Sequence, residues 1–226
     1  AWATTISEAL SAVAILYVMT RRTDACKLDL KKLHFHRKPI EKMLRIGVPA
    51  GIQSSMFSLS NVVIQSAVNG FGSIAVSGNA AVANLEGFEY VIVNSFHQTA
   101  VNFVGQNSGA MRYDRVKKTT WLCEIYAVIF GIVTGVLMCV FAPQLLSLYI
   151  TDSQEAISIG IARMYITVLP YCLFAIQDVI TGVLRGLGAS FISMLLSVLG
   201  ICGIRILWIY TIFQIPQFHT QRVLYM

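Results

Sequence analysis

The stretch from Trp121 to Tyr149, WLCEIYAVIFGIVTGVLMCVFAPQLLSLY, contains a single charged side chain, that of Glu124. A helix of about 20 apolar residues crosses the hydrocarbon core of a bilayer, because each residue advances the helix by about 1.5 Å. The quoted stretch is longer than this. It therefore predicts a membrane-spanning helix, with lipid as the solvent of the fold.

The rest of the chain repeats this pattern. Of its 226 residues, 56% are hydrophobic and 12% are charged, whereas a soluble domain has about 25% charged residues. Long apolar blocks without strict alternation favour helices over the strands of a membrane barrel. The sequence predicts an all-α integral membrane protein, a polytopic bundle of about six transmembrane helices, at residues 1–19, 46–69, 79–105, 121–149, 157–184 and 190–213.

The segments that connect these blocks alternate in charge. Residues 20–45 are strongly basic, and basic residues recur near Arg112 and at Arg185. By contrast, residues 70–73 are uncharged, and the charged residues within 151–155 are both acids. The positive-inside rule places the basic segments in the cytoplasm. This predicts a multi-pass protein of the cell (inner) membrane with membrane lipid as a partner. The formal net charge of +6 is thereby explained without nucleic acid, which is not expected as a partner.

The third block is unusually polar for a membrane helix. Asn94, Gln98 and Asn102 recur every fourth residue and so share one helical face. A neighbouring face carries ionisable side chains, namely Glu86, Glu89 and His97. A charge at the bilayer centre costs about 2.5–3.5 kcal/mol on insertion scales. Hydrogen bonding between helices is one explanation for these residues, and a water-filled cavity is the one we favour. Glu124, near a basic loop, is expected to reach the interface instead.

The fifth block carries the acid that we expect to be most important. Asp178 lies eight residues after Pro170, which removes a backbone hydrogen bond and is expected to bend the helix. A carboxylate beside such a bend is suited to bind and release a proton or a sodium ion. The alternative is a structural ion pair between Asp178 and Arg205 of the next block.

Three stretches resemble the multidrug and toxic compound extrusion (MATE) family of antiporters. They are GVPAG at residues 47–51, VGQNSGA at residues 104–110 and GVLRGLG at residues 182–188, the last expected to form a tight turn. The family has twelve helices in two lobes, and the resemblance implies a bacterial fragment that covers helices six to eleven, most of one lobe. Residues 1–19 would be the last helix of the first lobe, residues 20–45 a basic cytoplasmic linker and residues 46–226 the second lobe, incomplete at the C-terminus. The missing first lobe of the same chain would be a partner.

The resemblance also implies a function. Family members export organic cations and other amphipathic compounds in exchange for sodium ions or protons, without a cofactor and without enzymatic chemistry. Some members place carboxylates where Phe57 and Phe174 align here, so the expected coupling residues are Asp178, Glu86 and Glu89, with sodium at Asp178 as the metal ion to consider. The substrate cavity is expected to be lined by Gln53, Phe57, Asn61, Tyr90, Asn94, Gln98, Phe174 and Gln177.

Other functions remain open at this point. A lipid-linked sugar flippase of the same superfamily would need a basic cavity to hold a pyrophosphate, whereas the acids above predict an acidic cavity and favour cation export. A non-transporting partner subunit is a different class, in which Glu86 and Asp178 would be replaceable. A membrane-embedded enzyme has the least support, because no nucleophile or metal-ligand motif is present.

Overall fold

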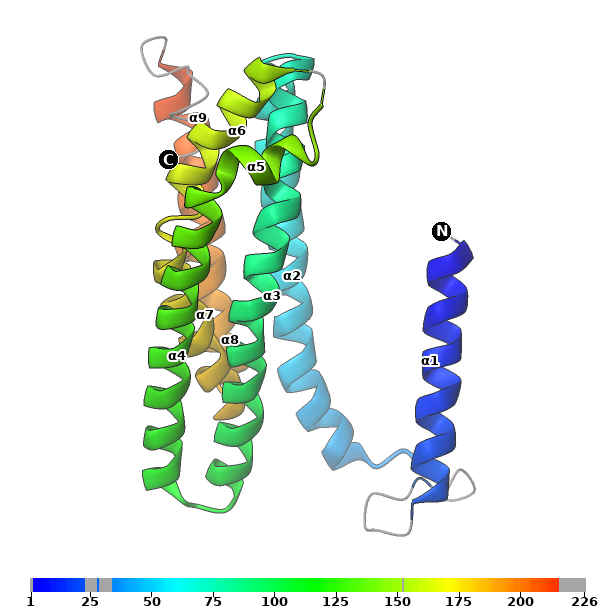
Figure 1. The fold of residues 1–226 in the computed structure, drawn as a ribbon. Helices are drawn as coiled ribbons and strands as arrows, with labels where there is room; N and C mark the ends of the chain where they lie inside the picture. The colour runs from blue at the N-terminus through cyan, green and yellow to red at the C-terminus, as the bar shows by residue number, and fades with distance from the viewer. Residues whose placement is uncertain (1, 23–27, 29–33, 152, 216–226) are drawn as a thin grey trace. The chain divides into compact units, whose positions relative to one another are not determined.

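The computed structural model describes residues 2–22, 28, 34–151 and 153–215, and every regular element in these residues is a helix. The chain forms two compact units, Ala1–Met43 and Leu44–Met226. The first unit contains α1 (Trp2–Arg21), which buries none of its side chains. The second unit contains almost all of the remaining helices (Figure 1). The assignment of residues 1–19, 20–45 and 46–226 to two lobes and a linker stays a prediction.

Long helices follow one another up and down the second unit. Their bounds are α2 (Arg37–Asn69), which begins just before this unit, α3 (Ser73–Gly109), α4 (Tyr113–Val140), α5 (Ala142–Ser147), α6 (Gln154–Thr167), α7 (Tyr171–Gly186), α8 (Ser190–Ser197), a π-helical segment (Val198–Gly203), α9 (Ile204–Tyr210) and a short 3₁₀ turn (Ile212–Gln214). Each predicted block contains a helix. α2 and α3 begin before the blocks predicted for them, because α2 starts with polar and basic turns and because Ser77, Gly78 and Asn79 interrupt the apolar pattern near the start of α3.

Hydropathy supports fewer spans than the six predicted. In the described part of the chain three helical runs are long and apolar enough to cross a membrane, namely α1, α4 and the run Ser190–Gln214, and α6 with α7 makes a fourth if this bent pair is one span. α2 and α3 have 33 and 37 residues, more than the roughly 20 that a span requires. They fail on composition, because both carry polar side chains along their length.

Proline interrupts two of the predicted blocks. The predicted bend near Pro170 is confirmed, because α6 ends at Thr167, α7 begins at Tyr171 and the two helices meet at 50°. The block at residues 121–149 also breaks, with α5 starting just before Pro143. Pro49, by contrast, is buried inside an uninterrupted α2.

α3, α4, α6 and α7 pack into one group, with α3 beside α4 in Figure 1. Glycine lets α7 approach α3 closely: a Cβ atom at Gly182 would lie 2.9 Å from the carbonyl oxygen of His97, and one at Gly186 would lie 2.9 Å from that of Val101. Small residues four apart are a common device for such contacts between membrane helices. The expectation that residues 182–188 form a turn holds only for the end of this stretch: α7 continues to Gly186, and the turn is at Leu187 and Gly188, where Gly188 has a φ of 82°.

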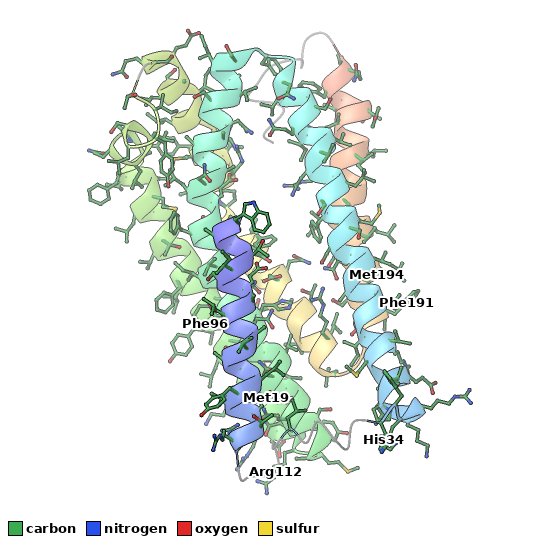
Figure 2. The ribbon with its side chains drawn as sticks, turned by 90° about the vertical axis from the view of Figure 1, so that its right-hand side faces the viewer. Met19, His34, Phe96, Arg112, Phe191 and Met194 are labelled. Atoms are coloured by element: carbon green, nitrogen blue, oxygen red, sulfur yellow. The ribbon has the colours of Figure 1, made fainter. Side chains whose placement is uncertain are left out.

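α2 and α9 lie on the opposite side of the unit. Val68 of α2 packs against Ile209 of α9 and Phe213 in a small apolar cluster. Figure 2 shows α2 beside α9, across from α3 and α4, with α7 between the two groups. This arrangement places the polar faces of α2 and α3 around a common space.

Candidate functional site: a polar cavity between α2, α3, α7 and α9

A cavity of about 770 Å³ lies in the second unit between α2, α3, α6, α7 and α9. All eight residues predicted to line a substrate cavity lie along it, three on α2, three on α3 and two on α7: Gln53, Phe57, Asn61, Tyr90, Asn94, Gln98, Phe174 and Gln177. The structure therefore brings these side chains together. Their role in binding a substrate stays a prediction.

α2 faces the cavity with one side chain per turn, because Gln53, Phe57 and Asn61 are spaced by four residues. Two amides of this face meet arginines from other helices. Arg185 of α7 donates from Nη2 to Gln53 Oε1 at 2.7 Å. Arg205 of α9 donates from Nη1 to Asn61 Oδ1 at 3.3 Å. Arg205 lies two residues after the end of the π-helical segment, a local change of helical register that is frequent at functional sites.

Asp178 is paired with a histidine. His97 Nδ1 lies 3.3 Å from Asp178 Oδ1 and 2.8 Å from the backbone carbonyl oxygen of the same residue. A carbonyl oxygen only accepts hydrogen bonds, so Nδ1 carries the hydrogen in this arrangement. Both side chains are largely buried. The alternative of an ion pair between Asp178 and Arg205 does not hold, because among the described residues Asp178 pairs with His97 and Arg205 donates to Asn61.

Glu86 is held in a second polar cluster. Arg163 Nη2 donates to Glu86 Oε2 at 2.6 Å, and the Thr167 hydroxyl donates to Glu86 Oε1 at 2.6 Å. Arg163 also donates to the backbone oxygen of Asn79 at 2.7 Å and to the side-chain oxygen of the same residue. Arg163 was not among the predicted site residues, although a single basic residue inside the apolar block at residues 157–184 is a usable signal.

Glu89 and Glu124 do not line the cavity. Glu89 is fully buried, next to Gly135 and Thr134 of α4, and the Thr134 hydroxyl donates to the Phe130 carbonyl oxygen at 2.7 Å. Glu124, expected to reach the interface, instead has both carboxyl oxygens buried. Within the described residues, neither carboxyl group makes a hydrogen bond of ordinary geometry.

Aromatic rings form part of the cavity wall. The ring centroid of Phe174 lies 6.4 Å from that of Tyr90 and 5.0 Å from that of Tyr171. Phe57 contributes a further ring from α2. These rings offer a surface on which a flat apolar group stacks favourably.

The charge of the lining differs from the acidic cavity that the sequence predicted. The carboxylates that line it are those of Glu86 and Asp178, whereas three guanidinium groups line it, those of Arg163, Arg185 and Arg205. The prediction of an acidic cavity is therefore wrong. It counted Glu89, which is buried elsewhere, and it assigned Arg185 to a cytoplasmic turn.

A second cavity, of about 530 Å³, adjoins the first. The two share the polar residues Asn61, Glu86, Arg163, Thr167 and Arg205. The Glu86–Arg163 ion pair and the Arg205–Asn61 hydrogen bond thus mark the boundary between the two spaces.

Long apolar helices around a polar, charged cavity define a helical lobe of a membrane transporter. The MatE family model matches residues 49–211, and the chain therefore belongs to this family. Two relatives are the probable multidrug resistance protein YoeA of Bacillus subtilis, 28% identical over 91% of this chain and 45% of its own, and the FAD transporter of Shewanella oneidensis, 24% identical over 85% and 41%. The chain thus spans less than half the length of these relatives.

The solved structures agree on the fold. The outward-facing structure of a multidrug resistance MATE family transporter of the MOP superfamily matches 99% of this chain and 50% of its own, with a TM-score of 0.88 and 16% sequence identity. At this identity the match shows a shared fold, that of a MATE transporter lobe.

Proposed function

We propose that the chain supplies the second lobe of a secondary transporter that exports amphipathic solutes in exchange for a cation. Family membership supports transport in general, and the cavity supports the location of the binding site for the solute. One observation carries the proposal: the largely buried Asp178–His97 pair lies on the wall of the same cavity as the amides and aromatic rings. Solute and coupling ion would therefore bind in the same cavity, so that binding of one would weaken binding of the other, as exchange requires.

Asp178 is the proposed coupling residue. Glu86 is less suited, because Arg163 and Thr167 already occupy its two carboxyl oxygens. Glu89 is less suited because it lies outside the cavity lining. Asp178 Oδ2 makes no hydrogen bond to the described residues, so this carboxyl oxygen is the one available to bind the coupling ion.

We propose a proton as the coupling ion. Among the described residues the partner of the Asp178 carboxyl group is one imidazole nitrogen, His97 Nδ1, and the second carboxyl oxygen is left to take up a proton. A sodium ion is a hard cation that prefers several oxygen ligands, and in the described part of the chain no second carboxylate lies against Asp178. Sodium at Asp178 is the competing outcome of the test below.

Two other functions are kept as alternatives. A lipid-linked sugar flippase gains support from the three arginines, since the requirement for a basic cavity is now met. A non-transporting partner subunit would explain neither the cavity nor the charged groups inside it, because unused charges in a membrane bundle are costly.

The test uses inside-out vesicles that contain the full-length parent protein, with a fluorescent solute on the outside. An imposed inward-acidic pH gradient should drive solute uptake, and uptake should in turn dissipate the gradient. Asp178→Asn should abolish both signals, whereas Asp114→Asn, in the exposed first turn of α4, should leave them intact. Uptake that requires a sodium gradient would identify sodium, and not the proton, as the coupling ion. Equal uptake by the Asp178→Asn and Asp114→Asn variants would show that Asp178 has no part in coupling.

A further inference from the structure

We propose that this cavity binds amphipathic aromatic anions. The aromatic body of the anion would lie between two positively charged groups of the protein. This inference names the substrate class and rests on the proposed function only for the direction of movement. Its basis is the arrangement of Arg185, Phe57 and Arg205 along α2.

Arg185 and Arg205 are the cations that the cavity leaves without a carboxylate. In the described part of the chain, each guanidinium group hydrogen-bonds an amide oxygen, of Gln53 and Asn61 respectively. Arg185 Nε is buried and has no partner there. An amide oxygen is neutral and leaves the positive charge of the guanidinium group uncompensated, whereas a carboxylate or phosphate neutralises that charge and can accept two parallel hydrogen bonds from it.

Neither carboxylate of the cavity is left for a cationic solute. Glu86 is paired with Arg163 at 2.6 Å; Asp178 lies against His97 through one carboxyl oxygen, and its other oxygen is the one proposed to take the coupling ion. An organic cation that entered would therefore meet two guanidinium groups and would have to compete with the coupling ion for the one available carboxyl oxygen. An anion could form ion pairs with both guanidinium groups, because guanidinium presents a planar fork of N–H donors that matches carboxylate and phosphate.

The spacing along α2 sets the shape of the guest. Gln53 and Asn61, which hold the two arginines, are eight residues apart, or about 12 Å along a helix. Phe57 lies one turn from each. The Tyr90 and Phe174 rings stand in the same cavity, 6.4 Å apart. The order is cation, aromatic surface, cation, so a flat ring system with an acidic group at one or both ends fits best.

Two sources supply this chemistry. A soluble aromatic carboxylate or phosphate is one, and a lipid-linked pyrophosphate is the other, because both present an anionic head on an apolar body. The same two arginines would serve either guest. The aromatic rings of the cavity are the one feature that favours a soluble aromatic anion over a lipid-linked pyrophosphate, because a flat ring system stacks on them.

The test measures binding directly, so that it does not depend on transport. Purified full-length protein in detergent is titrated with carboxyfluorescein, an anionic xanthene dye, and with rhodamine 123, a cationic dye with the same ring system, and fluorescence polarisation is recorded. We expect carboxyfluorescein to bind more tightly. Arg205→Gln and Arg185→Gln should each weaken its binding about tenfold or more, as expected for a lost hydrogen bond to a charged group.

Control variants separate charge from folding. Arg112→Gln, at the exposed turn between α3 and α4, should leave binding unchanged, and Arg185→Lys should recover part of the affinity. Tighter binding of rhodamine 123, or carboxyfluorescein binding that both glutamine variants leave unchanged, would overturn the inference. Competition then identifies the source: displacement by naphthalene disulfonate indicates a soluble anion, and displacement by farnesyl pyrophosphate alone indicates a lipid-linked one.

The same preparations distinguish this inference from the proposed function. Carboxyfluorescein that binds but is not moved in vesicles would support the anion site and contradict export. Movement of rhodamine 123 without binding of carboxyfluorescein would support export and contradict the anion site.

Discussion

His97 and Asp178 hold α3 and α7 together through one imidazole nitrogen, which lies 2.8 Å from the Asp178 carbonyl oxygen and 3.3 Å from its carboxyl oxygen. The carbonyl contact fixes the ring, and the fixed ring then faces the carboxyl group. We infer that His97 positions Asp178 through an N–H donor rather than through a positive charge. This inference has a direct chemical test.

The first prediction concerns substitution of His97. The side-chain amide of asparagine places an N–H close to the position of Nδ1, so His97→Asn should keep the contact and retain most of the pH-driven export measured in inside-out vesicles. His97→Ala removes the donor and should lower export at least about tenfold, equal to about 1.4 kcal/mol. Protein amounts are matched by immunoblot. If asparagine and alanine fail equally, His97 carries the proton itself.

The second prediction concerns Gly182, which permits the His97–Asp178 contact. A Cβ atom there would lie 2.9 Å from the His97 carbonyl oxygen and 3.2 Å from its Nδ1, both too close for ordinary contact. Gly182→Ala should separate α3 from α7 and destabilise the protein by about 1–3 kcal/mol, the usual cost of overpacking. Thermal unfolding of the full-length parent in detergent measures the change.

The matched control for Gly182 is Gly87, also inside a long helix. A Cβ atom at Gly87 would meet nothing within 4 Å, and alanine favours a helix over glycine by about 0.5–1 kcal/mol. Gly87→Ala should therefore leave the melting temperature unchanged or raise it slightly. Equal losses in both variants would show that backbone flexibility, rather than contact between α3 and α7, explains the effect.

Much of the fold was predictable from the sequence because lipid imposes a simple rule. A long apolar block must be helical to satisfy its backbone hydrogen bonds, and Pro170 marks the break between α6 and α7. The starts of α2 and α3 were not predictable in this way. α2 starts with polar and basic turns, and in α3 the apolar first turn is separated from the rest of the block by Ser77, Gly78 and Asn79.

The candidate site was predictable where it depends on one helix and not where it depends on two. Phe57 and Asn61 share a face of α2 by their spacing alone, and both line the cavity. The pairing of Asp178 with His97 depends on how closely α7 approaches α3, which Gly182 determines. The basic character of the cavity was missed because Arg185 near a loop resembles an ordinary cytoplasmic charge.

The third prediction concerns the Glu86–Arg163 ion pair, which is mostly shielded from solvent. Removing one partner of such a pair leaves an uncompensated charge, which is more costly than removing both. Arg163→Met should lower the melting temperature more than the double variant Glu86→Met with Arg163→Met does. If the double variant is the less stable one, the pair contributes net stability in itself.

The fourth prediction concerns Glu89, which was expected to be a coupling residue and which the structure places outside the cavity lining. Its side chain is fully buried against α4, with Oε1 3.4 Å from the position that a Cβ atom at Gly135 would take. An isolated carboxylate in such a place is costly to ionise. Glu89→Gln has the same shape and no charge, so it should fold normally and keep at least half of the export rate.

Glu89→Ala provides the contrast, because it removes the same acid but leaves a void. That variant should be less stable by about 2–5 kcal/mol, as for other large-to-small substitutions in a packed interior, and it should lose export in proportion to the folded protein lost. A Glu89→Gln protein that unfolds at the temperature of the parent yet exports nothing would contradict this interpretation. Glu89, and not only Asp178, would then carry the coupling ion, and the route of the ion would have to pass between α3 and α4.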